Sequence, residues 1–121
     1  LLFGLLWAVW HAPLFLISGT YQHGVAEMGQ PLYVANFFVS VIPAAIIANW
    51  FYYKNDRSIV IAVLVHSMLN AAAVLLNAGQ IAKCIATLLY AGIAAGLVLG
   101  DRKLFAAGPS NFVIPAKAGI Q

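Results

Sequence analysis

The chain has 121 residues, of which 64% are hydrophobic and only 7% are charged, whereas about 25% of the residues in an average soluble domain are charged. A mean hydropathy of +0.94 agrees with this composition, and together they exclude a water-soluble globular domain. The length allows one domain and about four or five membrane-crossing helices of about 20 residues each. The net charge of +3 comes from basic residues at the edges of apolar segments, so no nucleic-acid partner is expected.

Four apolar segments follow one another along the chain. The first begins at Leu1 without a methionine or a signal peptide, which indicates a piece of a longer protein. Each segment is expected to be helical, because backbone polar groups in a bilayer need partners within the segment, and the strict alternation of a β-barrel is absent. We therefore predict an all-α, polytopic transmembrane bundle of about four helices, at residues 1–17, 32–53, 59–76 and 81–100.

The basic residues predict how the bundle sits in the membrane. If the helices alternate in direction, five of the six basic residues lie on one side of the membrane and only Lys83 lies on the other. The positive-inside rule makes the side with five the cytoplasmic one. The sequence thus predicts an integral protein of the bacterial cytoplasmic membrane with a cytoplasmic C-terminus. The five residues are Lys54, Arg57, Arg102, Lys103 and Lys117.

The chain divides into a membrane domain, residues 1–103, and a tail, residues 104–121. The tail contains two prolines and no helical periodicity, so it is predicted to be flexible. Its last residues resemble peptides translated from dispersed bacterial repeats, and we interpret them as non-native readthrough. The single cysteine, Cys84, excludes an internal disulfide.

An ionisable residue inside a membrane segment is a functional hypothesis by default, and His11 is the first one. Trp7 and His11 are four residues apart, so both rings face one side of a helix. Pro13 removes a backbone donor just beyond the histidine and can bend the helix there. The alternative is a structural histidine bonded to the backbone of a neighbouring helix.

His66 and Asn70 form a second pair with the same spacing, so they also share a helix face. The alternative for this pair is hydrogen bonding that only holds helices together. At 1.5 Å per residue, His66 lies about 12 Å and His11 about 9 Å from the nearer end of its segment. Both depths fall near the middle third of a hydrocarbon core about 30 Å thick, so the two imidazoles can meet in one buried polar pocket. Asn36 and Asn49 are weaker candidates.

These two pairs resemble motifs of a known family, the CPBP intramembrane proteases, also called CAAX-prenyl-endopeptidase-like or Abi proteins. The element from Trp7 to His11 is similar to the family's second motif, Phe-x-x-x-His, with tryptophan in place of phenylalanine. His66 and Asn70 match its third motif, His-x-x-x-Asn. The first motif, Glu-Glu-x-x-x-Arg, is missing from this sequence. Glu27 follows His11 in a polar loop without an arginine behind it, so we assign it no role in that motif.

The resemblance implies an intramembrane endopeptidase that cleaves membrane-associated peptides, of CAAX or bacteriocin-like type, within the bilayer. A glutamate upstream and His11 would activate water, while His66 and Asn70 would stabilise the oxyanion, and Trp7 would be the motif aromatic. Without the glutamate motif this chain alone is expected to be inactive. If the family uses a metal such as Zn²⁺, His11 and His66 are the ligands available here, one short of the usual three.

A non-enzymatic membrane protein remains the alternative. A transporter segment or a peptide-binding immunity protein would use the same histidines and asparagine only to hold its helices together. The sequence leaves the substrate, the metal dependence and the oligomeric state undetermined.

Overall fold

The computed structural model describes residues 2–75 and 78–106, and this part of the chain is helical without any strand. The prediction of an all-α membrane bundle is confirmed. In chain order the elements are α1 (Leu2–Trp10), the 3₁₀ helix η1 (Ala12–Leu16), α2 (Tyr21–Glu27), α3 (Pro31–Lys54), α4 (Ile59–Leu75), α5 (Gln80–Gly100) and α6 (Arg102–Ala106).

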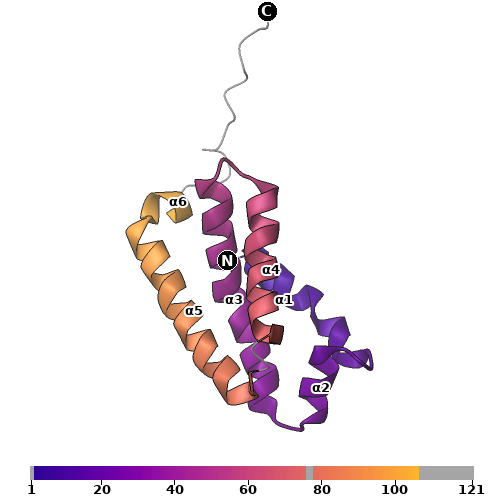
Figure 1. The fold of residues 1–121 in the computed structure, drawn as a ribbon. Helices are drawn as coiled ribbons and strands as arrows, with labels where there is room; N and C mark the ends of the chain where they lie inside the picture. Colours follow the sequence, from indigo (N-terminus) through magenta and orange to yellow (C-terminus); the bar gives the residue numbers. More distant parts are fainter. Residues whose placement is uncertain (1, 76–77, 107–121) are drawn as a thin grey trace, which may run out of the picture.

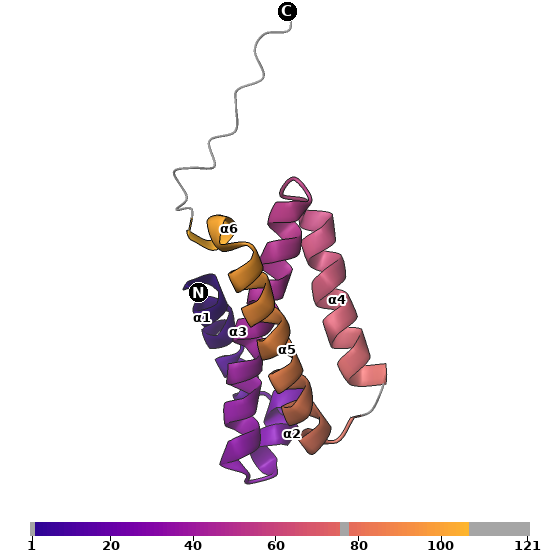
Figure 2. The same ribbon diagram turned by 90° about the vertical axis from the view of Figure 1, so that its left-hand side faces the viewer.

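The long helix α3 is the centre of the bundle. Helices α1, α4 and α5 pack against it, and α2 lies beside its first turns (Figures 1 and 2). The approach of α1 is close at Gly4, where an added Cβ would lie 3.3 Å from the Cβ of Ala45. Because small residues let helix backbones come together in a membrane, Gly4 and Ala45 fix the position of α1 on α3.

Two of the described helices, α3 and α5, are long and apolar enough to span a bilayer. The first apolar segment supplies a third span if α1 and η1 are taken together with α2, although the pair is bent by 69°. The third predicted segment, α4, is a shorter helix, apolar over Ile59–Ala72, and does not reach the length of these candidate spans. The four predicted segments are therefore all helical, but they differ in length and straightness.

The first segment is not one continuous helix, as the range 1–17 had suggested. Its α-helix ends at Trp10, and a 3₁₀ helix with Pro13 in its first turn continues to Leu16. Thr20 then caps α2 by accepting a hydrogen bond from the backbone N–H of His23. At the other end of the chain, residues 104–106 belong to α6, while the rest of the predicted tail, residues 107–121, lies outside the described part.

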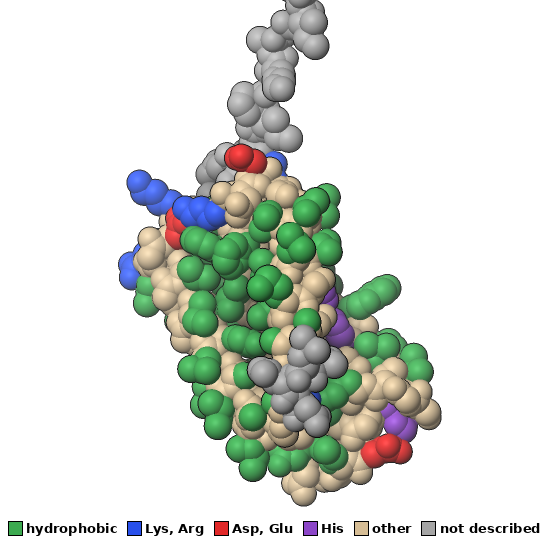
Figure 3. Space-filling model, viewed as in Figure 1, with side chains coloured by type: hydrophobic (Ala, Val, Ile, Leu, Met, Phe, Trp, Pro, Cys, Tyr) green, Lys and Arg blue, Asp and Glu red, His purple; other side chains and the backbone are tan. Residues whose placement is uncertain are grey.

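Hydrophobic side chains cover the flanks of the bundle, and charged side chains gather at its ends (Figure 3). Helices α3 and α5 end on the same side, where Lys54 and Asp101 form an ion pair with an N–O distance of 2.5 Å. This bond holds the pKa of the Asp101 carboxyl below its ordinary value, since the carboxylate accepts a hydrogen bond from Lys54. Lys54, Arg57, Arg102 and Lys103 thus lie at one end, as the charge pattern predicts, and Lys117 is outside the described residues.

Candidate active site

The first part of the site is built by the break between α1 and η1. Pro13 has no backbone N–H and its ring excludes a regular helical turn before it, and the backbone N–H of His11 donates to Ala8, only three residues earlier. The His11 side chain turns back onto the same helix, where its Nδ1 lies 2.7 Å from the carbonyl oxygen of Trp7. The proline therefore helps to hold the imidazole in one orientation.

Trp7 connects the two predicted histidines. The centroid of its ring system lies 6.0 Å from that of His11 and 4.9 Å from that of His66. His11 comes from the end of α1, whereas His66 comes from the middle of α4, 55 positions further along the chain. The packing of both helices on α3 thus brings the two imidazoles to one indole, as the depth argument predicts.

Asn70 completes the group through His66. The two side chains lie one turn apart on α4, and the Asn70 Nδ2 is 2.9 Å from the His66 Nε2. Asn70 is exposed, while His66, His11 and Trp7 are half-buried. All four residues predicted from the sequence therefore gather at the contact between α1 and α4, and one end of the group is open.

An aromatic wall that the sequence analysis did not identify closes the other side of His11. Phe37 of α3 contacts the imidazole edge-on, with ring centroids 5.6 Å apart. Phe15 and Phe38 pack on Phe37 at 5.4 and 5.6 Å, and Tyr21 approaches it at 6.4 Å. The adjacent pair Phe37-Phe38 was the available signal, but neighbouring phenylalanines are common in apolar helices.

Comparison with known proteins identifies the family. Residues 1–72 match the family described as type II CAAX prenyl endopeptidase Rce1-like. The chain belongs to that family. The matched region includes the residues of both motifs, and with them Trp7, His11, His66 and Asn70.

A curated relative agrees with this assignment. CAAX prenyl protease 2 of Methanococcus maripaludis is 37% identical over 105 residues, which are 87% of this chain and 38% of that protein. The chain therefore spans well under half of the length of this relative. The Rce1-like match and the spanning helices together make this the chain of an integral membrane protein.

The remaining polar candidates of this Rce1-like chain lie in other surroundings. Glu27 forms an i, i+4 pair with His23 on α2, at 3.5 Å, and its side chain is 70% exposed. Asn36 and Asn49 are half-buried on α3, and Cys84 is a free, half-buried thiol on α5. We therefore do not include these four residues in the candidate site.

The predicted metal ligands do not by themselves form a catalytic zinc site. Among the described residues, no group of three or more His, Cys, Asp or Glu side chains is placed to hold a metal ion. Catalytic zinc usually takes three protein ligands and a water, so His11 and His66 supply at most two.

Proposed function

We propose that this chain carries part of the active site of an intramembrane endopeptidase that cleaves membrane-associated peptides of the CAAX type. The supporting observation is the gathering of His11, His66 and Asn70 around Trp7, from two helices of an Rce1-like chain. The name of the archaeal relative, CAAX prenyl protease 2, points to the same substrate class.

The hydrogen bond of His11 suits it to be a general base. A backbone carbonyl can only accept, so the Nδ1 of His11 donates to the oxygen of Trp7. In the neutral imidazole the lone pair then lies on Nε2. This nitrogen can take a proton from a water molecule that attacks the peptide carbonyl, and such proton transfer accelerates hydrolysis by about 10²–10⁴-fold.

The bond between Asn70 and His66 suits this pair to stabilise an oxyanion. An amide nitrogen can only donate, so Asn70 donates to the Nε2 of His66. The neutral imidazole of His66 then carries its proton on Nδ1, and Asn70 keeps a second N–H. Each donor aimed at the developing oxyanion contributes about 10²–10³-fold, more effectively in a site that excludes water.

The carboxylate that would assist His11 is not supplied by a Glu-Glu motif in this chain. Its single glutamate, Glu27, pairs with His23 on α2. We therefore expect the purified 121-residue chain to leave a CAAX-type peptide uncleaved. Hydrolysis by this chain that disappears in His66→Ala would contradict that expectation.

The basic end of the bundle supports an orientation. Lys54, Arg57, Arg102 and Lys103 lie together where α3 and α5 end, and we propose that this end faces the cytoplasm of a bacterium, by the positive-inside rule. Lys83, at the start of α5, then lies on the opposite side. Protease protection of tags placed at either end of the chain in membrane vesicles tests this assignment.

A chimera tests the enzymatic proposal directly. The matched 105-residue region of the archaeal relative is replaced by the corresponding part of this chain, and cleavage of a fluorescent prenylated CAAX peptide is measured in liposomes. We expect the chimera to hydrolyse the peptide if the parent does. A chimera that inserts and folds like the parent but does not cleave would favour the alternative in which the histidines are structural.

A further inference from the structure

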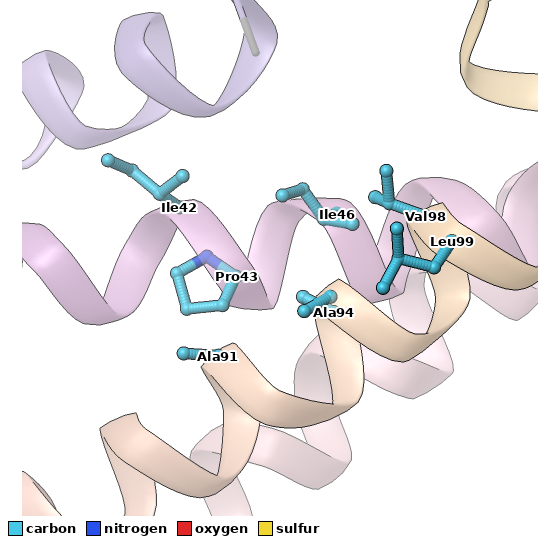
Figure 4. Close-up of a pocket in the computed structure, with 8 residues that line it drawn as sticks. Ile42, Pro43, Ile46, Ala91, Ala94, Val98 and Leu99 are labelled. Carbon is cyan, nitrogen blue, oxygen red and sulfur yellow. The ribbon is translucent and has the colours of Figure 1, made fainter. Parts of the chain in front are cut away.

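An apolar groove lies between α3 and α5 and shares no residue with the candidate active site. It has a volume of about 430 Å³, and the described residues that line it are aliphatic side chains and a proline. Figure 4 shows Ile42, Pro43 and Ile46 of α3 on one side and residues of α5, including Ala91 and Ala94, on the other. The groove is thus a hydrocarbon surface on the flank of the bundle.

Small side chains on α5 make this groove. Ala91, Ala94 and Ala95 leave space that larger residues would fill, and Ala91 and Ala95 are exposed. None of the described residues that line the groove has a polar side chain, so an extended peptide would find no side-chain partner among them for its N–H and C=O groups, and burying those groups is costly. The occupant that fits this lining is a flexible alkyl chain.

The groove is as long as one leaflet of a bilayer is deep. From Ala91 to Leu99, the helix rises by about 12 Å at 1.5 Å per residue. Half of the hydrocarbon core is about 15 Å thick. Leu99 lies two residues before Asp101, at the end where charged side chains gather. An alkyl chain in the groove would therefore point its polar end toward the basic end of the bundle.

The charges at that end select the kind of headgroup. Four basic side chains lie there with two acidic ones, and Arg102 and Lys103 at the start of α6 are exposed. Lys54 pairs with Asp101, so these two charges offset each other. An excess of basic residues at the headgroup level attracts anionic lipids. Among the described residues, this set is Lys54, Arg57, Arg102 and Lys103, with Asp56 and Asp101.

We propose that this groove binds one anionic phospholipid of the leaflet at the basic end. Its acyl chain lies between α3 and α5, and its phosphate lies against the basic residues at the start of α6. The site is separate from the candidate active site and does not depend on peptide hydrolysis. Its occupant is a lipid, so a free phosphate ion, which has no alkyl chain, binds only weakly.

Native mass spectrometry of the purified 121-residue chain in detergent tests this site. The probes are dioleoylphosphatidylglycerol, dioleoylphosphatidylcholine with the same acyl chains, and inorganic phosphate. We expect one tightly retained phosphatidylglycerol and weaker binding of phosphatidylcholine. Lys103→Gln should weaken phosphatidylglycerol binding about fivefold, the factor that corresponds to one basic residue near an anionic headgroup. Lys83→Gln, at the opposite end of α5, is the charge-matched control and should have no effect.

Filling the groove with larger side chains distinguishes binding of one lipid in the groove from non-specific binding of lipids around the bundle. Ala91→Leu combined with Ala95→Leu should weaken phosphatidylglycerol binding by about tenfold or more, because the added side chains take the place of the acyl chain. Ala82→Leu, exposed on an earlier turn of α5, is the control for a leucine added outside the groove. Equal binding of both lipids, or competition by inorganic phosphate alone, would overturn the proposal. A dimer that disappears on filling would also overturn it, because a second copy would then occupy the groove.

Discussion

Two prolines of this chain have opposite effects on their helices. Pro13 lies just after the end of α1, where the chain changes to a 3₁₀ helix. Pro43 lies inside α3, which continues unbroken from Pro31 to Lys54. An internal proline costs a helix about 3 kcal/mol, and the packing of α1, α2, α4 and α5 against α3 offsets this cost. The short helix α1 has fewer such contacts and ends at the proline.

The difference shows how the same residue can produce a polar site or an apolar surface. At Pro13, the break is accompanied by a bond between the His11 side chain and the Trp7 carbonyl. At Pro43, the ring remains in register with the helix and lines the groove toward α5. The packing around each proline therefore decides whether the helix breaks there, as beside His11, or continues and presents the ring to a neighbouring helix, as at Pro43.

The largest expected effect is at the polar site. In the chimera, His11→Ala should lower the cleavage rate by about 10²–10⁴-fold, since it removes the proposed general base. His23→Ala, a histidine on α2 that pairs with Glu27, is the matched control and should cleave normally. Equal rates for both variants, at equal yield of folded protein, would remove His11 from the mechanism.

The second largest expected effect on the cleavage rate is that of Asn70, which donates a hydrogen bond to His66. Asn70→Ala should lower the cleavage rate by about 10²–10³-fold without a matching rise in KM, because an oxyanion donor acts in the transition state. Combining it with His66→Ala should cost little more than either change alone, as expected for residues that act together. Asn49→Ala, on α3, is the control. A rise in KM alone would make Asn70 a binding residue.

The prolines themselves give a smaller effect. Pro13→Ala should lower cleavage on the order of tenfold, because a continued α-helix would bring the His11 backbone N–H toward the Trp7 carbonyl and displace the side chain. Pro43→Ala should leave cleavage unchanged and alter only the thermal stability of the bundle. The two variants differ by position alone, so equal losses of cleavage would show that the break at Pro13 does not orient His11.

The smallest expected effect is a change in melting temperature from breaking the ion pair at the basic end of the bundle. Asp101→Asn removes the ion pair with Lys54 and should lower the melting temperature slightly at pH 7, since exposed pairs contribute little. The pKa of Asp101 is lowered in the folded chain, so its contribution is present above the ordinary carboxyl pKa of about 4 and is lost as the pH falls below it. Melting curves in detergent should therefore differ at neutral pH and converge in acid. A difference that persists in acid would point to another cause.

Much of the site could be predicted from the residues themselves. The spacing of Trp7 and His11, and of His66 and Asn70, sets each pair on one helix face wherever the helices lie. Pro13, two residues after His11, also indicated from the sequence where the α-helix gives way to a 3₁₀ helix. Phe37 could not be predicted as the wall of the site, because the pair Phe37-Phe38 is common in apolar helices and does not show which residue of another helix it contacts.

The sequence by itself determined the membrane setting, the helical class and the two motif pairs, because composition and local spacing act within single segments. Only the tertiary structure decided that α1 and α4 meet at Trp7 and that a groove opens beside Pro43. These features depend on contacts between helices that are distant in the chain. Close packing at small residues such as Gly4 and Ala45 fixes those contacts, and no single segment contains that information.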